Sequence, residues 1–174
     1  ACIYLDRQYL LGDSLLVAPI FNELSTASYY LPEGRWTHLL SGEEVRGGRY
    51  CKETYDYFSL PLFARPNSLI PIGKETQSCD YDFARDVTFH LFALDEGRSA
   101  ESQIYDAKGE VVATCTIVHE DGVFGVKAKG NLGPWAVFLH NEHSVETASI
   151  GMLEKTEKGT LVSFSGGELE ATIQ

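Results

Sequence analysis

Alternation with a period of two is the feature of this sequence that most restricts its fold. Residues 111–118 read Val-Val-Ala-Thr-Cys-Thr-Ile-Val, so every second side chain falls on the same face of an extended strand. Asp121-Gly122 follows, and a second alternating run begins at Val123. Because glycine adopts the positive φ that a tight turn demands, Asp-Gly between two such runs predicts a β-hairpin.

The same succession of strand and turn residues recurs along the chain. Further turn predictions fall at Pro32-Glu33-Gly34, Gly47-Gly48, Ala107-Lys108-Gly109 and Ser165-Gly166-Gly167. Turns spaced about 8–12 residues apart are typical of a β-sandwich, and no amphipathic helix of more than about two turns is evident. The sequence therefore predicts an all-β chain with two β-sandwich-type domains.

A change in composition predicts the boundary between the two domains. Residues 74–78 are polar and lack periodicity, and a fresh strand begins near Val87. We expect a proximal domain over residues 1–83 and a distal domain over 84–174. A β domain of about 80 residues buries only about 60–65% of its extended-chain surface. The proximal domain should therefore expose apolar surface that a neighbour would cover.

The charge balance restricts the partners. The chain carries 25 acidic and 14 basic residues, for a formal net charge of -11. A nucleic-acid partner requires clustered Lys and Arg, which are scattered here, and surplus acid repels anionic lipid surfaces. We expect no nucleic-acid or membrane partner. A neutral partner, such as a sugar or another protein, is easier to accommodate.

Four cysteines, Cys2, Cys51, Cys79 and Cys115, lie far apart without a Cys-x-x-Cys pair. This spacing favours four reduced thiols and a cytoplasmic origin, while two disulfides stay open as the alternative. No signal peptide is visible at the start of the sequence.

Motifs for nucleophilic or metal chemistry are incomplete. Gly12-Asp13-Ser14 lacks the second glycine of a nucleophile elbow. His140 and His143 end a strand, where residues three apart point to opposite faces, so a polar loop is favoured over a metal site. No phosphate-binding glycine loop occurs. We therefore expect no catalytic residue, no cofactor and no metal ligand.

Acidic side chains occur in close pairs, and a glycosidase does use two carboxylates. The pairs are Glu43-Glu44, Asp80/Asp82, Asp95-Glu96 and Glu120-Asp121. Each lies in or beside a predicted turn, where carboxylates are commonly solvated, so we interpret them as turn residues.

Aromatic residues are concentrated between residues 29 and 63. Exposed Trp and Tyr could stack on sugar rings, as in a carbohydrate-binding module, whereas alternating aromatics more often fill a core or an interdomain contact. We favour packing.

Several segments resemble glycoside hydrolase family 31. Residues 9–20, Tyr-Leu-Leu-Gly-Asp-Ser-Leu-Leu-Val-Ala-Pro-Ile, are similar to the segment that follows the family's catalytic barrel. Residues 30–37 resemble its Leu-Pro-x-Gly-x-Trp turn, and residues 60–65 its Pro-hydrophobic-Phe/Tyr-x-Arg strand. Gly47-Gly48 matches its paired glycines, and Ser68-Leu69-Ile70-Pro71 continues the strand. Pro66-Asn67 and Asp80-Tyr81-Asp82 are closer to the α-xylosidase branch than to typical α-glucosidases.

This resemblance implies a retaining α-glycosidase, α-xylosidase or α-glucosidase, whose Asp nucleophile and Asp acid/base lie on a barrel upstream. No position here matches either motif, so the chain would be the non-catalytic C-terminal β region of such an enzyme. It would support the barrel and could contribute an oligomer interface. Tyr30, Trp36 and Phe63 would then pack in the core or against the barrel. The alternatives are a free-standing carbohydrate-binding or protein-interaction sandwich.

Overall fold

A computed structural model describes residues 6–174. It contains sixteen strands and no helix over these residues, which confirms the all-β prediction. Accordingly, no helix in this part of the chain is long and apolar enough to cross a membrane. The chain divides into two compact units between Pro66 and Asn67.

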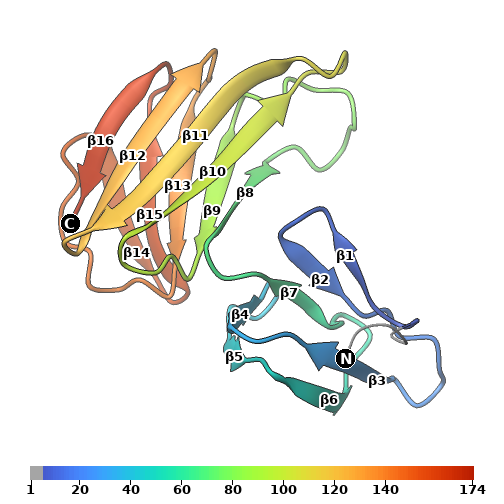
Figure 1. The fold of residues 1–174 in the computed structure, drawn as a ribbon. Helices are drawn as coiled ribbons and strands as arrows, with labels where there is room; N and C mark the ends of the chain where they lie inside the picture. Colours follow the sequence, from blue (N-terminus) through green and yellow to red (C-terminus); the bar gives the residue numbers. More distant parts are fainter. Residues whose placement is uncertain (1–5) are drawn as a thin grey trace. The chain divides into compact units, whose positions relative to one another are not determined.

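The first unit contains one five-stranded antiparallel sheet and one two-stranded ribbon (Figure 1). The sheet has the order β1-β2-β7-β4-β5 and the ribbon pairs β3 with β6. The strands are β1 (Tyr9–Leu11), β2 (Leu15–Val17), β3 (Thr26–Leu31), β4 (Arg35–His38), β5 (Glu44–Arg46), β6 (Arg49–Thr54) and β7 (Leu62–Ala64).

Aromatic residues fill the core of the first unit. Trp36 and Phe63 are each 2% exposed, and the ring of Phe63 lies 5.6 Å from that of Tyr29. Trp36 donates a hydrogen bond from its Nε1 to the carbonyl of Pro32 at 2.9 Å. An indole buried with its N–H satisfied contributes a large apolar area without a polar penalty.

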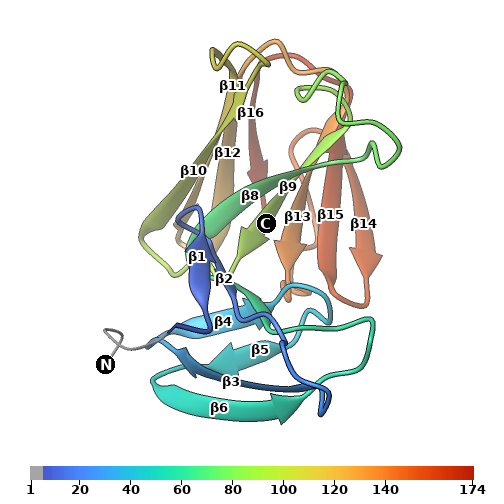
Figure 2. The same cartoon turned by 90° about the vertical axis from the view of Figure 1, so that its right-hand side faces the viewer.

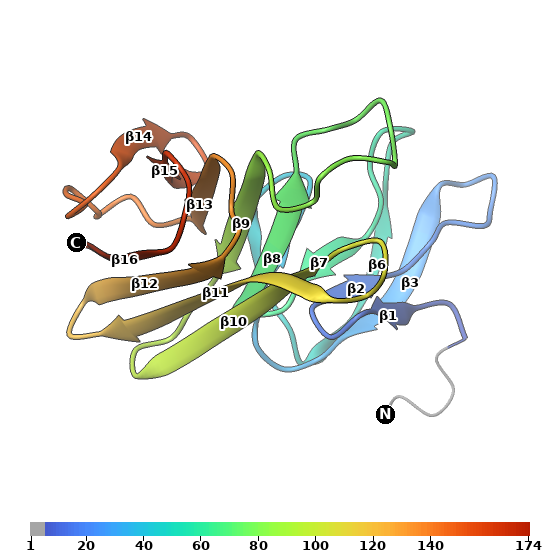
Figure 3. The same ribbon diagram turned by 90° about the horizontal axis from the view of Figure 1, so that it is seen from above.

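The second unit is a sandwich of two sheets, which Figure 2 shows from the side and Figure 3 from above. One sheet has the order β10-β11-β12-β16 and the other β14-β15-β13-β9-β8. The strands are β8 (Ser68–Gly73), β9 (Val87–Phe92), β10 (Arg98–Tyr105), β11 (Val111–Glu120), β12 (Val123–Gly130), β13 (Trp135–His140), β14 (Met152–Thr156), β15 (Gly159–Phe164) and β16 (Leu169–Ile173).

Alternating side chains of both sheets form the sandwich core. On β11, Ala113, Cys115 and Ile117 are buried, as the period of two predicts. The Asp121-Gly122 hairpin between β11 and β12 is confirmed, and both residues have positive φ, 52° and 73°. The hairpin around Gly109 between β10 and β11 is confirmed as well.

The other three predicted turns lie where expected, but they connect strands of different sheets. Pro32–Gly34 joins β3 to β4, Gly47-Gly48 joins β5 to β6, and Ser165–Gly167 joins β15 to β16. A glycine-rich turn indicates that the chain reverses, and only long-range packing decides whether the flanking strands pair.

The compact units divide the chain earlier than the predicted limits of 1–83 and 84–174. Strand β8 pairs with β9 from Ser68↔Phe92 to Gly73↔Val87. Six consecutive residue pairs therefore place β8 in the sheet of the second unit, although a polar loop separates β8 and β9 in the sequence.

Candidate functional site

Large apolar side chains are exposed on the first unit. They lie on β1, in the loop after β2, between β4 and β5, on β6 and in the loop after β6. They comprise Tyr9, Leu10, Leu11, Phe21, Leu24, Leu40, Tyr50, Tyr57 and Phe58. Phe21, Tyr57 and Phe58 are 81%, 96% and 87% exposed. The exposed apolar surface predicted for the proximal part is therefore present. A concentration of this kind is typical of a surface that docks on another protein body.

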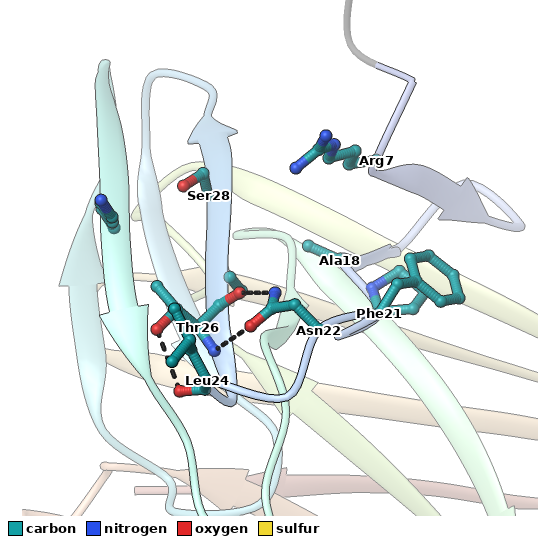
Figure 4. A pocket seen from close by; sticks show the side chains of 10 residues that line it. Arg7, Ala18, Phe21, Asn22, Leu24, Thr26 and Ser28 are labelled. Carbon is teal, nitrogen blue, oxygen red and sulfur yellow. Dashed lines mark hydrogen bonds between the residues drawn. The ribbon is translucent and has the colours of Figure 1, made fainter.

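A groove of about 520 Å³ lies within this unit, beside strand β3 (Figure 4). Its walls combine exposed Phe21 and Leu24 with the cationic side chains Arg7 and Lys52. Asn22 is hydrogen bonded to the backbone of Thr26 at one end. Ser28 and Arg7 lie toward the other end in the figure. The groove thus offers apolar, cationic and backbone groups together.

A second groove, of about 490 Å³, contains a carboxylate held by two phenols. The Oε2 atom of Glu53 accepts hydrogen bonds from the Tyr29 and Tyr55 hydroxyls, both at 2.6 Å. Burial alone would raise the pKa of the Glu53 carboxyl, but these two bonds hold its pKa below the ordinary value. Burial and the bond to Glu53 raise the pKa of both tyrosines. This cluster links β3 to the C-terminal end of β6 and leaves Glu53 ionised.

Two histidines form a pair in the second unit that the sequence does not reveal. The Nδ1 atom of His90 and the Nε2 atom of His140 lie 2.9 Å apart, on neighbouring parallel strands β9 and β13. Phe92 stacks on His140 with 4.2 Å between ring centroids. Nδ1 of His140 is buried and has no hydrogen-bond partner among the described residues. Burial lowers the pKa of His90 to about 4. Burial together with the charges of His90 and Lys158 lowers the pKa of His140 to about 3.

The histidine pair predicts a loss of stability in mild acid. The ordinary histidine pKa is about 6.5, so the unfolded chain binds more protons than the folded chain as the pH falls below that value. Stability is therefore complete above about pH 6.5 and should drop by about 2 kcal/mol per histidine by pH 5. Urea unfolding at pH 7 and pH 5 measures this difference. The double variant His90→Phe/His140→Phe should flatten it, and equal stability of the unsubstituted chain at both pH values would contradict the assignment.

The structure places the candidate catalytic residues in turns. Gly12-Asp13-Ser14 forms the reversal between β1 and β2, where Gly12 has a φ of 61°. The paired carboxylates are all exposed, and several stabilise local backbone: Asp82, for example, accepts a hydrogen bond from the N–H of Ala84. Within residues 6–174, no group of three His, Cys, Asp or Glu side chains could hold a metal ion. His140 turns to His90, whereas His143 is exposed.

The three residues predicted to pack against a barrel have different environments. Trp36 and Phe63 lie in the core of the first unit. Tyr30 is partly buried, and its ring lies 4.9 Å from that of exposed Tyr50. Of the predicted aromatic cluster, only Tyr50, Tyr57 and Phe58 expose most of a ring. A buried Trp36 cannot stack on a sugar, which removes the residue on which a carbohydrate-binding role most depended.

Cysteines Cys51, Cys79 and Cys115 are free thiols in the described part of the chain, and Cys2 lies outside it. Burial raises the pKa of Cys115 to about 12, which keeps this thiol protonated and unreactive. Cys115 is thus a small core residue, as the alternation predicts.

Comparison with known proteins agrees with the fold. The sequence model described as "Alpha-xylosidase YicI, C-terminal domain" matches residues 82–174, and "Glycosyl hydrolase family 31 C-terminal domain" matches residues 1–70. The α-xylosidase XylQ of Lactiplantibacillus pentosus is 31% identical over 157 residues, which cover 88% of this chain and 20% of XylQ. An α-xylosidase of Emericella nidulans is 40% identical over 77 residues, covering 40% of this chain and 10% of that enzyme.

A solved structure shares the same fold. The family 31 dextranase of Flavobacterium johnsoniae superposes with a TM-score of 0.77 at 17% identity, over 97% of this chain and 26% of the dextranase. These β domains are C-terminal domains of a class of multidomain glycoside hydrolases. The chain belongs to glycoside hydrolase family 31, of which it forms C-terminal domains. It spans about a fifth of the length of XylQ and a tenth of the Emericella nidulans enzyme.

Proposed function

We propose that this chain is the non-catalytic C-terminal region of a retaining α-glycosidase and that its first unit supports the catalytic barrel. The observation that carries the proposal is the exposed apolar surface of the first unit, including Phe21, Tyr57 and Phe58. Such side chains are removed from water only when another protein body covers them. Burial of each large one stabilises the protein by about 1.5–3 kcal/mol. Barrel active sites are built from loops, which a rigid neighbour holds in place.

Tyr30, Trp36 and Phe63 take different parts in this support. Tyr30 with Tyr50 presents an aromatic pair toward the barrel, because both rings lie on the side of the β3–β6 ribbon away from the core. Trp36 and Phe63 act from inside, since they are buried in the unit and fix the shape of its surface. None of the three touches substrate in this proposal.

The proposed substrate class is an α-xyloside. The match to the α-xylosidase C-terminal domain over residues 82–174 and the names of two relatives support it. Hydrolysis of p-nitrophenyl α-D-xyloside and of the corresponding α-glucoside by the complete chain compares the two activities. A clear preference for the xyloside is expected, and a preference for the glucoside would assign the chain to an α-glucosidase instead.

Removing exposed aromatic rings should distinguish contacts with the barrel from the stability of the 174-residue chain itself. Tyr57→Ser with Phe58→Ser should leave the unfolding of the 174-residue chain unchanged, because both rings are almost fully exposed. In the complete enzyme the same pair should cost about 3 kcal/mol and lower kcat together with thermal stability, since both rings would be buried there. Thermal unfolding and initial rates measure the two effects.

Met152 provides a matched control for this experiment. It is a large apolar residue, 79% exposed, on strand β14 of the second unit. Met152→Ser should leave both forms of the protein unchanged within about 0.5 kcal/mol. If the aromatic variant also leaves the complete enzyme unchanged, the loop after β6 does not take part in barrel support.

A further inference from the structure

The β3–β6 ribbon has a free edge along β3. Residues 25, 27, 29 and 31 face β6 with their backbone groups, as the bond from Tyr55 N–H to Ser25 carbonyl at 2.9 Å shows for this register. The backbone N–H and C=O groups of Thr26, Ser28 and Tyr30 consequently point away from β6. Unpaired groups at a sheet edge are a template for another extended chain.

Two side-chain amides close this edge on both sides of Ser28. The Gln8 amide accepts from the N–H of Tyr30 at 2.7 Å and donates to its carbonyl at 2.8 Å. The Asn22 amide does the same at Thr26, with distances of 3.2 Å and 2.6 Å. Each primary amide thus takes the place of one residue of a neighbouring antiparallel strand, because it offers a donor and an acceptor side by side, as the N–H and C=O of such a residue do.

Ser28 lies between these two closed positions and is open. It is exposed, and the register with β6 leaves its backbone N–H and C=O without a hydrogen-bond partner within residues 6–174. The groove of about 520 Å³ lies at this point of the edge and includes Ser28 (Figure 4). The two amides show that a donor and an acceptor side by side fit this edge. At Ser28 the edge has room for the N–H and C=O of one further residue.

We propose that the groove binds a segment of the remaining enzyme chain, one residue of which pairs its backbone N–H and C=O with Ser28 between the two amides, while an acidic side chain of the segment lies near Arg7 and Lys52. The inference rests on the proposed function, since the occupant comes from the rest of the glycosidase. A single residue of the segment fits between the two amides, and its N–H and C=O add two backbone hydrogen bonds to the edge.

The charged and apolar groups of the groove favour particular side chains in the bound segment. Within the described residues, the ion pair of Arg7 is a 4.0 Å contact to Asp6 at the exposed surface. Lys52 extends from the neighbouring strand into the same groove. A carboxylate of the segment would be attracted to both cations. Phe21 and Leu24 form the apolar part of the wall, so an apolar residue next to the acidic one completes the fit.

Amide hydrogen exchange of the complete enzyme tests the pairing. The Ser28 amide should exchange at least about 100-fold more slowly in the complete enzyme than in the 174-residue chain, because a new hydrogen bond protects it. Thr54 supplies the control: its N–H also points outward, but on the opposite edge of the ribbon. Fast exchange at Ser28 in the complete enzyme, or equal protection at Ser28 and Thr54, would overturn the proposal.

A matched pair of proline variants gives a second measurement. Proline is tolerated at an outward edge position because the N–H that it removes is unused within the sheet. Ser28→Pro should therefore shift the melting temperature of the 174-residue chain no more than Thr54→Pro does. In the complete enzyme Ser28→Pro should lower the melting temperature by several degrees more than Thr54→Pro. Equal shifts in the complete enzyme would count against strand pairing.

The two proposals fail in different ways. A complete chain without α-glycosidase activity overturns the proposed function, whatever Ser28 does. An active enzyme in which the Ser28 amide exchanges freely overturns only the docking of a segment in the groove. Slow exchange that reverts after Arg7→Glu with Lys52→Glu would support the acidic character of the occupant, and unchanged exchange in that variant would contradict it.

Discussion

Trp36→Ala should lower the free energy of unfolding of the first unit by about 3–5 kcal/mol. The indole is 2% exposed, and its loss leaves a cavity that β4, β3 and β7 cannot fill without moving. It also removes the donor that satisfies the carbonyl of Pro32. Calorimetric unfolding of the 174-residue chain measures the change, because the circular dichroism and fluorescence signals both alter when an indole is removed.

Trp36→Phe distinguishes the two contributions to this loss. Phenylalanine retains one aromatic ring of the buried side chain while it removes the Nε1–H donor, so its cost should be about 1–3 kcal/mol. If Trp36→Ala instead left stability intact and abolished binding of a xyloside or glucoside to the chain, Trp36 would belong to a sugar site. Its burial argues against that outcome.

Gly47→Ala should destabilise the first unit by about 3 kcal/mol or more. A Cβ atom at position 47 would lie 1.7 Å from the carbonyl oxygen of Pro32, which is backbone and cannot rotate away. The N–H of Gly47 also donates to the carbonyl of Gly34 at 2.9 Å, so the turn before β4 and the turn before β6 are held together. Urea unfolding followed by circular dichroism measures the loss.

Gly125→Ala is the control for the glycine prediction. The nearest atom to a Cβ at position 125 is 3.9 Å away, and its φ lies outside the left-handed region. Replacing a strand glycine in this conformation should be neutral or stabilise by about 0.5–1 kcal/mol. A Gly47 variant as stable as the Gly125 variant would show that the two turns of the first unit separate easily, contrary to the structure.

Trp36 and Gly47 should not behave independently. Trp36 donates a hydrogen bond to the carbonyl of Pro32, and Gly47 leaves the space that this carbonyl occupies, because a Cβ there would collide with it. Once Gly47→Ala has displaced this carbonyl, less is lost on removing the indole donor. The double variant should therefore be less destabilised than the sum of the single variants, as expected for residues that share a partner.

Local sequence determines the hairpins of the second unit. Strands β10, β11 and β12 follow each other with short turns at Gly109 and Asp121-Gly122, and the alternation of β11 defines its buried face. Turn residues with positive φ act within a few positions, so their effect is visible in the sequence. The membership of family 31 is visible in the same way, from short motifs such as residues 9–20.

Pairings between distant segments are not determined locally. Strand β8 joins β9 across a polar loop, β13 lies parallel to β9, and β3 pairs with β6 rather than with its neighbour β4. An alternating strand can pair with any other of similar length, and the choice depends on which faces pack together in the whole unit. The predicted boundary at 83/84 rests on composition, which does not record these pairings.

The candidate interaction surface shows the same division. By itself, the sequence determines an all-β chain of family 31, with its hairpins and buried alternating faces and without matching catalytic motifs. Tertiary structure alone decided that Trp36 and Phe63 are buried while Tyr57 and Phe58 are exposed, because all four are aromatic residues in similar local patterns. It alone brought His90 to His140, fifty residues apart, and placed the Gln8 and Asn22 amides on either side of Ser28. These arrangements depend on contacts between segments far apart in the chain, which local propensity and periodicity do not encode.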